Sequence, residues 1–567
     1  PVQGFVAQAR RTRDLWAGSF LLSWLSGQAM AAVLENGGDI EFPFVGTIDD
    51  PKDDMLRAIL RKHHNHPHIG SIPNRFKAQV PESFDPKVLT DRLQNKWMDL
   101  CEAVWDSFVS DVAGNGTREI WDRQVTNFWE IQWIKGKSEN GEDKRWLDLR
   151  KNWRSHWPTI EGGDHCVLMS DFQEISGFCR ANNRDKQDEF WKKINNPYKL
   201  GLLDLRPDER LCAIALVKRL FPKLSKESLI QTIGWIPGGK PQSTGNWPST
   251  VYMASVPWLE KISQQGKQSD LEIYVDEVKQ KCHKSIFSER ATQIKCLQDL
   301  SKDSKYLDGN FFQEITLKNH RVTPLSDHPM TNGKDPDKDL RDRLLLSLRD
   351  LYKVMGEPSS PYYALLLMDG DHLGILLGQL DPLSVSMALR KFTQMVPEIV
   401  EKHSGITIYA GGDDVLAILP INKVLDCAVE LRHEYGIAFK QFISEANDAT
   451  ASTAIIFSHF HNPFREVLSE AHHQLDDIAK EKNGRNSLSI ALMKSSGISA
   501  KWCVAWSYEK KSIPQYLKDL QDKIKEGEFS TGFFYNLRQR YSMIIDEEEN
   551  FKIGQIEPIF IAEYIKG

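Results

Sequence analysis

The sequence predicts an α+β fold, and three segments of its second half support this class. Residues 363–368 form an apolar run typical of a strand buried on both faces of a sheet. Residues 382–402 have the apolar spacing of an amphipathic helix. Residues 406–419 contain two β-forming runs around a Gly-Gly pair, which indicates a tight hairpin. Strand, helix and hairpin in this order predict one compact unit of sheet and helix.

Two acidic residues, Asp413 and Asp414, directly follow the hairpin glycines. Adjacent carboxylates repel each other unless a cation neutralises them. Their oxygens suit Mg²⁺ or Mn²⁺, which in turn bind substrate phosphates. The hairpin therefore predicts a metal site, and the simpler alternative is a solvated acidic turn.

A second acidic motif, Asp369-Gly370-Asp371, ends the apolar strand. Its two aspartates are two residues apart and so point the same way. We expect them to converge with Asp413 and Asp414 on one cleft, as in a two-metal phosphoryl-transfer site. Asp371 has an alternative role as a cap of the following helix.

The composition is that of an ordinary globular protein of about three or four domains. The 567 residues are 41% hydrophobic and 26% charged, and the net charge of −6 argues against a surface coated with basic residues. Eight scattered cysteines suit a reducing cytoplasm. No apolar run approaches the roughly 18 residues of a membrane span. The sequence starts without Met, so we expect the natural protein to extend further toward its N-terminus.

Polar or Pro- and Gly-rich stretches divide the chain. The opening residues indicate a strand end followed by a helix, and residues 128–134 alternate like a strand. We expect four regions: 1–155, a domain with a helical insertion; 156–342, a small, mostly helical region; 343–503, the unit with the acidic motifs; and 504–567, a helical C-terminal domain.

Several motifs are spread over nearly the whole chain. They are PVQGFVAQARRTRDLWAGS (1–19), SIPNRF (71–76), DERLCAIALVKRLF (208–221), PSTVYMASVPW (248–258), MDGDHLG (368–374), YAGGDD (409–414) and AKEKNGRNSLSIAL (479–492). Together they resemble the large palm-domain subunit of type III CRISPR effector complexes of the Cmr (III-B) type. GGDD alone is less specific, because diguanylate cyclases and related polymerases share the palm.

The resemblance implies two ferredoxin-like palm domains of nucleotide-cyclase type, in regions 1–155 and 343–503, with a mostly helical region between them and a helical C-terminal domain. It also implies conversion of ATP to a cyclic oligoadenylate messenger with two Mg²⁺ or Mn²⁺ ions per site. The implied partners are other Cmr-type subunits, a guide RNA and a target RNA, with no membrane. Family members often carry an N-terminal HD nuclease domain, but no His-Asp dipeptide occurs here, so we expect no such nuclease activity.

The resemblance also implies roles for individual residues. Asp369, Asp413 and Asp414 are the expected catalytic metal ligands, with Asp371 and the Gly370 carbonyl as further candidates. The expected nucleotide contacts are Gly411, Gly412, Tyr409, Lys480, Arg485 and Ser19.

Several of these contacts have a simpler alternative. Lys480 and Arg485 resemble the basic residues that palm cyclases direct at a triphosphate, but both could instead be a solvated helix end. The Tyr409 ring could stack on adenine, or it could pack in the core.

Family members commonly bind zinc through CxxC pairs, and this chain has none of those pairs. His165, Cys166, Cys179 and Cys212 could form a degenerate zinc site. The alternative, that they are ordinary residues of the small region, is the one that we favour.

Two other functions stay open from the sequence. One is a stand-alone dinucleotide cyclase that uses GTP, although GGDD replaces the GGDEF form of those enzymes. The other is a catalytically silent scaffold that organises guide RNA and neighbouring subunits, against which the intact acidic set argues.

Overall fold

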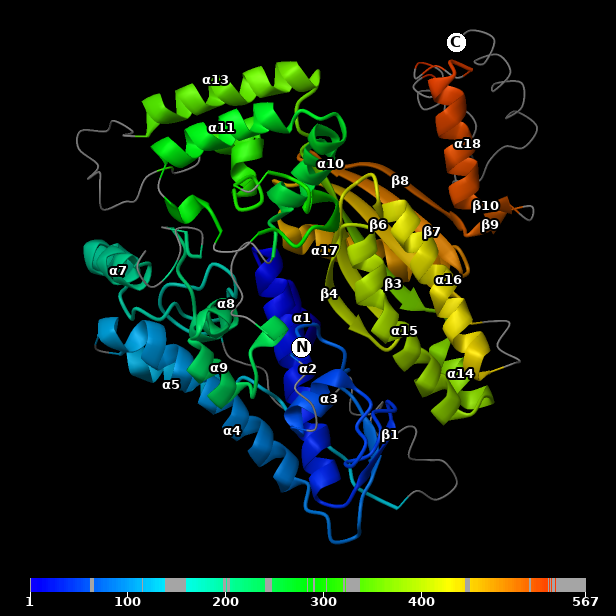
Figure 1. Cartoon of the computed structure of the whole chain (residues 1–567). Coiled ribbons are helices and arrows are strands. Elements are labelled where there is room, and N and C mark those ends of the chain that lie inside the picture. Colours follow the sequence, from blue (N-terminus) through cyan, green and yellow to red (C-terminus); the bar gives the residue numbers. More distant parts are fainter. Residues whose placement is uncertain are drawn as a thin grey trace. The chain divides into compact units, whose positions relative to one another are not determined.

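The second half of the chain is built on one mixed β-sheet, as a computed structural model of residues 1–567 shows (Figure 1). The structure describes residues 2–61, 66–114, 116–137, 160–196, 200, 204–206, 208–239, 247–282, 284–288, 291–301, 303–319, 322, 337–443, 449–508, 511–528, 530, 532 and 536. It divides into two compact units, Pro1–Cys503 and Val504–Gly567, which are described separately. The α+β fold class predicted from the sequence is confirmed.

The sheet has six strands in the order β4-β5-β3-β6-β7-β8. Their bounds are β3 (Tyr362–Gly370), β4 (Ile406–Gly411), β5 (Asp414–Leu419), β6 (Ala451–His459), β7 (Ser487–Lys494) and β8 (Gly497–Ala505). Strand β3 is antiparallel to both β5 and β6, and β6 is parallel to β7. Because β3 lies between two partners and is covered on both faces, seven of its nine residues are buried.

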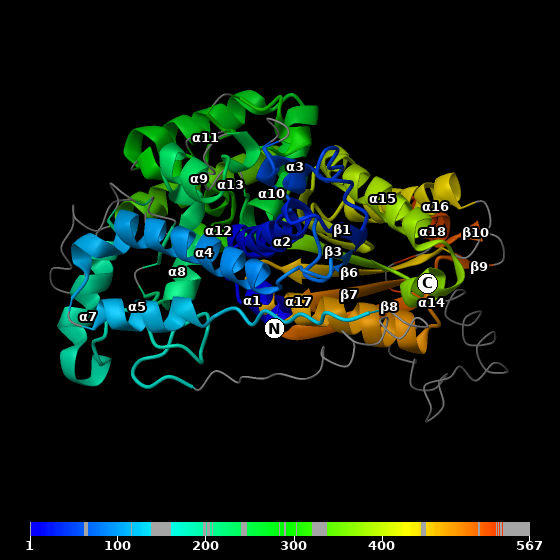
Figure 2. The same ribbon diagram turned by 90° about the horizontal axis from the view of Figure 1, so that it is seen from below.

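Helices cover both faces of this sheet (Figure 2). On one face lie α15 (Pro382–Lys402) and α16 (Val424–Phe442), which pack against each other and against β3, β4, β5 and β6. On the other face lie α17 (Phe464–His472) and its π-helical continuation η9 (His473–Lys482), which pack against β6 and β7. A short helix, α14 (Leu373–Gln379), leads from β3 to α15.

The first region is organised around the long helix α2 (Thr12–Glu35), which follows the short α1 (Val2–Ala7). Helix α2 is long and apolar enough to cross a membrane by length and composition, but 89% of its apolar window is buried inside the protein. It is therefore packed as a core helix. The other elements here are β1 (Asp39–Phe42), α3 (Asp54–Ile59), β2 (Lys77–Gln79), α4 (Lys87–Val104), η1 (Trp105–Val109), η2 (Ser110–Val112) and α5 (Thr117–Thr126).

Buried ion pairs join the opening motif to the motif at residues 208–221. The Arg219 guanidinium bonds both carboxylate oxygens of Asp14 at 2.6 Å and also reaches Glu209 at 3.1 Å. Arg13 donates to Asp204 at 2.7 Å. Because a buried charge is costly without a partner, each of these charged groups depends on the other segment for its neutralisation.

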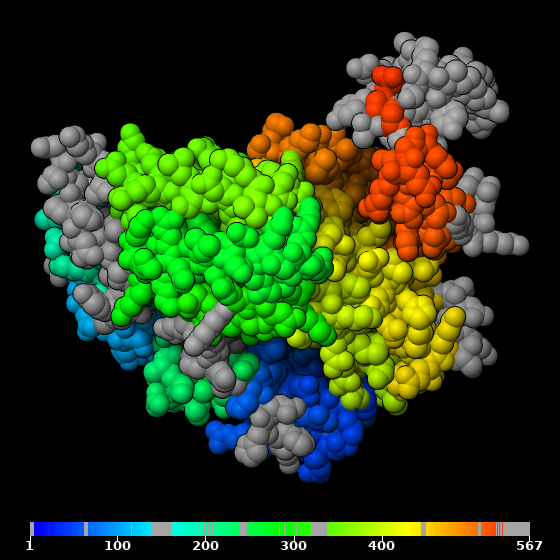
Figure 3. Space-filling model, turned by 45° about the horizontal axis from the view of Figure 1, so that its top comes forward, coloured from blue at the N-terminus to red at the C-terminus, as the bar shows by residue number. Residues whose placement is uncertain are grey.

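The described part of the middle of the chain is mostly helical. It contains α7 (Arg180–Ile194), α8 (Ala213–Leu220), η3 (Phe221–Lys223), α9 (Lys226–Thr232), η4 (Pro237–Gly239), α10 (Thr250–Gln264), α11 (Gln268–Lys281), η6 (Lys284–Ile286), η7 (Lys295–Leu297), η8 (Gly309–Phe312), α12 (Glu314–Leu317) and α13 (Lys338–Met355). Helices α11 and α13 pack side by side, and together they form a continuous green surface next to the yellow helices of the sheet domain (Figure 3). Lys423 pairs with Glu260 of α10 at 3.1 Å across this junction.

Some local predictions differ from the structure. The opening residues form helix α1 rather than a strand end, and residues 128–134 form no strand, because Phe128 and Trp129 pack as aromatic core residues around Trp97. Within the described part of residues 1–155, the strands are β1 and β2, which pair with each other. The expected first palm-like domain stays a prediction.

The second unit, Val504–Gly567, contains β9 (Ser507–Tyr508), β10 (Lys511–Ser512) and α18 (Ile513–Lys525). Most of the expected helical C-terminal domain lies outside the described residues.

Candidate metal and nucleotide site

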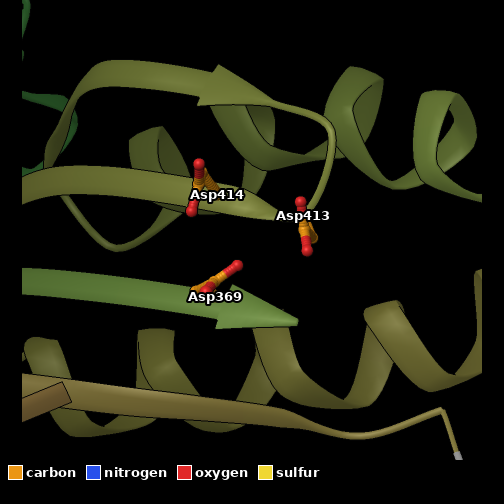
Figure 4. A group of neighbouring side chains, drawn as sticks. All are labelled: Asp369, Asp413 and Asp414. Carbon is orange, nitrogen blue, oxygen red and sulfur yellow. The ribbon is translucent and has the colours of Figure 1, made fainter. Parts of the chain in front are cut away.

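Three aspartates meet at one edge of the sheet. Asp369 is near the end of β3, Asp413 lies in the hairpin turn, and Asp414 begins β5. One carboxylate oxygen of each lies within 4.8 Å of the other two, and the three side chains converge in Figure 4. Strand β5 lies next to β3, so the hairpin turn and the end of β3 meet at the same edge. Three carboxylates at this spacing form a donor set that fits a hard divalent cation.

Burial and neighbouring carboxylates raise the pKa values of Asp413 and Asp414. Burial and the nearby Asp371 raise the pKa of Asp413 to about 6. Burial and the Asp413 carboxylate raise the pKa of Asp414 to about 7, although the Asp414 side chain keeps an opening to solvent. Without a cation the site therefore retains protons near neutral pH, and a divalent ion would release them.

Lys480 supplies the positive charge that this site has in the structure. Its ammonium group, on η9, donates to the Asp369 carboxylate. The Lys480 side chain is only 10% exposed, and burial together with the Arg485 guanidinium lowers its pKa to about 8. The sequence placed Lys480 at a phosphate, and the structure places it at the edge of the acidic cluster.

Asp371 lies outside the group of three aspartates, and its role as a metal ligand stays a prediction. It is fully buried, and one oxygen accepts from the Thr450 hydroxyl and the Asn486 N–H while the other accepts from the Ser452 hydroxyl, each at 2.8 Å. It also does not cap α14, which follows His372 without a side-chain cap. Asp371 instead ties the end of β3 to the segments around β6 and β7.

Gly370 is required by close packing. A side-chain carbon at this position would collide with the Tyr435 hydroxyl and would lie only 2.8 Å from the Asp413 Cβ atom. The absence of a side chain lets Asp413 approach β3. Coordination by the Gly370 carbonyl stays a prediction.

The hairpin that carries Asp413 is held from both sides. Gly412 has the positive φ of 65° that its turn requires, and its carbonyl accepts from the Thr393 hydroxyl at 3.1 Å. The Tyr409 ring folds back over Gly411, so a side chain at residue 411 would collide with it. Burial and the two hairpin aspartates raise the pKa of Tyr409. The Tyr409 ring is half-buried, as expected if it packs in the core rather than stacks on adenine. Nucleotide contacts by Tyr409, Gly411 and Gly412 stay predictions.

Ser19 reaches the site only through Gly70. The Ser19 side chain is buried on α2 next to Gly70, whose carbonyl accepts from the Ala410 N–H of β4 at 3.2 Å. Arg485 lies at the end of η9 and pairs with Glu481 at 3.3 Å. Neither residue belongs to the acidic cluster, and their nucleotide contacts stay predictions.

The four candidate zinc ligands are not brought together. Cys166 and Cys212 are buried neighbours, and the Cys212 Sγ atom lies 3.7 Å from the Met169 Sδ atom. The His165 ring bonds the Ser170 carbonyl instead, and Cys179 is exposed at the start of α7. Among the described residues, the three aspartates are the one His, Cys, Asp and Glu group with metal-ligand spacing.

Sequence reasoning missed Tyr435, whose hydroxyl lies beside Gly370 and Asp413. Burial and the nearby aspartates raise the pKa of Tyr435 well above its usual value. An aromatic residue on the apolar stripe of α16 looks like an ordinary core residue, so the sequence carries no signal for it.

Comparisons with known proteins agree with this geometry. Residues 362–489 match the family described as Cas10/Cmr2, second palm domain, and residues 1–102 match CRISPR-associated protein Cmr2, N-terminal. The "CRISPR system Cmr subunit Cmr2" of Pyrococcus furiosus is 24% identical over all of this chain and 68% of its own length. The "CRISPR system CMR subunit Cmr2" of Saccharolobus solfataricus is 25% identical over 37% of this chain and 23% of its own length.

Two solved structures have the same fold. One is a type III-B Cmr-beta complex in the apo state, with a TM-score of 0.57 and 14% identity over 100% of this chain and 76% of that chain. The other is Cmr-beta bound to cognate target RNA, with a TM-score of 0.58 and 15% identity over 100% of this chain and 77% of that chain.

The sheet, its helices and its acidic edge define a palm domain with a nucleotidyltransferase-like fold. The chain resembles the Cas10/Cmr2 family over residues 1–102 and 362–489, and the matches to the N-terminal and second palm domains occur in the expected order. The resemblance inferred from the sequence motifs is therefore confirmed.

Proposed function

We propose that this chain is the nucleotidyltransferase subunit of an RNA-guided type III-B CRISPR complex and converts ATP to a cyclic oligoadenylate. The observation that carries this proposal is the convergence of Asp369, Asp413 and Asp414 at the open edge of the palm sheet. A scaffold would gain nothing from three converging carboxylates, two of which have pKa values raised by burial and by a neighbouring carboxylate.

The three aspartates Asp369, Asp413 and Asp414 would hold two Mg²⁺ or Mn²⁺ ions. Bound there, the ions would polarise the reacting phosphate and lower the pKa of the attacking ribose hydroxyl. The protein contributes mainly position and charge, because phosphoryl transfer asks little covalent chemistry of side chains.

Lys480 would change its partner when the site is loaded. A cation at Asp369 takes over the neutralisation of that carboxylate, which frees the ammonium group for a triphosphate oxygen. Arg485, whose charge already influences Lys480, adds a second positive group on the same side. The two residues would therefore orient the leaving pyrophosphate.

The proposed partners follow from the relatives. The structural neighbours are Cmr-beta complexes, one of them bound to cognate target RNA. We place this chain in such an assembly in the reducing cytoplasm, which suits its eight scattered cysteines. Base pairing between guide and target would read sequence. We expect no HD nuclease activity from this chain.

The test uses the reconstituted complex with ATP, Mn²⁺ and target RNA, and mass spectrometry of the products. Asp413→Asn with Asp414→Asn should abolish the cyclic product while complex assembly, measured by size-exclusion chromatography, is kept. Glu398→Gln, an exposed charge on α15 of the same domain, is the matched control and should be active.

Three results would contradict the proposal. Product formation by the double variant would exclude the acidic site. Use of GTP in place of ATP, without other subunits, would favour a stand-alone cyclase. Assembly without any product from the wild-type complex would favour the silent scaffold.

A further inference from the structure

A buried tyrosine hydroxyl lies beside the acidic site, next to Gly370 and Asp413. Tyr435 is fully buried on α16, and its ring packs edge-on against Phe392 with ring centroids 5.1 Å apart. The ring centroids of Tyr435 and Phe439 are 4.9 Å apart. The two aromatic neighbours fix the ring, so the hydroxyl has a defined position.

This hydroxyl borders the same space as Asp413. A side-chain carbon at Gly370 would collide with the Tyr435 Oη atom and would lie 3.0 Å from the Asp413 Oδ2 atom. Gly370 has no such carbon, so both oxygens can lie close to the end of β3. Tyr435 lies on α16, on one side of the sheet, whereas Lys480 lies on η9, on the other side.

The Tyr435 hydroxyl has no hydrogen-bond partner among the described residues. A buried hydroxyl without a partner destabilises a protein, because it has lost its bonds to water. A phenylalanine would pack equally well there. The hydroxyl therefore points to a ligand that the site takes up.

We propose that Tyr435 is a positioning residue whose hydroxyl donates a hydrogen bond to a water molecule bound by the cation at Asp413. This inference rests on the proposed function, because it requires a divalent ion at the acidic cluster. A phenol is a donor and a poor ligand for Mg²⁺ or Mn²⁺, whereas their bound water needs a partner that holds its orientation.

The test is Mn²⁺ binding to the full chain without nucleotide, followed by electron paramagnetic resonance of the free ion. Tyr435→Phe should weaken Mn²⁺ binding about tenfold, the lower end of the effect of outer partners of a metal site. The thermal unfolding temperature of the metal-free variant should be unchanged or higher, because the substitution removes an unpartnered hydroxyl.

Two variants serve as controls. Tyr363→Phe removes a buried hydroxyl on the same strand as Asp369 but at its other end, and should bind Mn²⁺ like the wild type. Asp413→Asn should abolish binding at the site.

The outcomes separate the two proposals. Wild-type affinity in Tyr435→Phe, or an equal loss in Tyr363→Phe, overturns the role of Tyr435 and leaves the metal site standing. A lower unfolding temperature of metal-free Tyr435→Phe overturns it too, since the hydroxyl would then have a partner within the protein. No Mn²⁺ binding by the wild type overturns the metal site and the role of Tyr435 together.

Discussion

Lys480 donates to the Asp369 carboxylate, the same group that faces Asp413 and Asp414 across the palm edge. The ion pair joins η9 to β3, so one positive side chain compensates part of a three-carboxylate cluster. The pair is buried enough to matter, with side-chain exposures of 10% for Lys480 and 22% for Asp369. It makes the behaviour of the site depend on pH, on metal and on this lysine.

Replacing Lys480 should separate its two roles. Lys480→Met should destabilise the metal-free protein by about 1–2 kcal/mol, because Asp369 loses its partner. In the presence of Mn²⁺ this loss should shrink, while the KM for ATP rises about tenfold through the missing phosphate contact. Urea unfolding with and without Mn²⁺, together with steady-state kinetics, checks both effects. Lys482→Met, on the exposed face of η9, is the control and should change neither.

Metal affinity should depend on pH through the hairpin carboxyls. The pKa values of Asp413 and Asp414 are raised to about 6 and about 7, and only the ionised groups bind the cation. Mn²⁺ affinity should therefore be full near pH 8 and fall as the pH drops through 7 and 6. Isothermal titration calorimetry at several pH values measures this, and an affinity independent of pH between 5.5 and 8 would contradict it.

The pH dependence of the stability of the metal-free protein should be opposite to that of the metal affinity: the free energy of unfolding should fall as the pH rises. A carboxyl whose pKa is raised by folding stabilises the fold below its unfolded pKa, and this contribution is lost as the pH rises through the folded value. Asp413→Asn with Asp414→Asn should thus be more stable than the wild type at pH 8, by about 1 kcal/mol after allowance for the solvent opening at Asp414. Near pH 4 the difference should disappear. Denaturant unfolding with EDTA at both pH values checks this, and a variant that is less stable at pH 8 would exclude carboxylate repulsion.

The two aspartates of the DGD motif should behave differently. Asp371→Asn should lower the free energy of unfolding by about 2–4 kcal/mol, because a fully buried carboxylate with three hydrogen bonds is disrupted. Asp369→Asn should cost only about 1–2 kcal/mol, through the weakened ion pair with Lys480, and should remove Mn²⁺ binding. Chemical unfolding and Mn²⁺ titration of both variants are the measurements. Loss of metal without loss of stability in Asp371→Asn would restore Asp371 as a ligand.

Cys166 and Cys212 have backbone surroundings suited to a thiolate metal site. The backbone nitrogens of Leu168 and Met169 each lie 3.4 Å from the Cys166 Sγ atom. The backbone N–H groups of Ile214 and Ala215 point toward the Cys212 sulfur. Met169 and Ala215 occupy the third position after each cysteine, where a CxxC pair would have its second thiol.

Met169→Cys combined with Ala215→Cys should therefore create a tetrahedral zinc site. We expect one Zn²⁺ per double variant by mass spectrometry of the metal content, and less than stoichiometric zinc in the wild type and in each single variant. If the double variant is refolded with excess Zn²⁺ and still contains no zinc, the native and the introduced thiols do not converge on one point, and the prediction is wrong.

The parts of the site that could be predicted from the sequence follow local rules. The apolar run ending at Asp369 and the Gly-Gly hairpin before Asp413 are short-range patterns, and adjacent strands bring their ends together. The helices α15 and α16 follow from periodicity in the same way.

The rest depends on contacts that no local pattern encodes. The Asp371 carboxylate accepts hydrogen bonds from Thr450, Ser452 and Asn486, which lie 79 to 115 residues further along the chain. The hydroxyl of Tyr435 is placed by the packing of α16, and its apolar surroundings in the sequence predict only a core residue. The strand expected at residues 128–134 was wrong because alternation in an aromatic-rich segment is also produced by residues that fill a helical core.

The hydrogen bond from the Ala410 N–H to the Gly70 carbonyl connects the acidic edge of the sheet to the N-terminal region. Gly70 rests on Ser19 and Ser23 of α2, so a shift of that helix is passed to the strand that leads into the Gly411–Asp414 turn. A partner bound to the first hundred residues would therefore contact the same helix that supports the turn with Asp413 and Asp414.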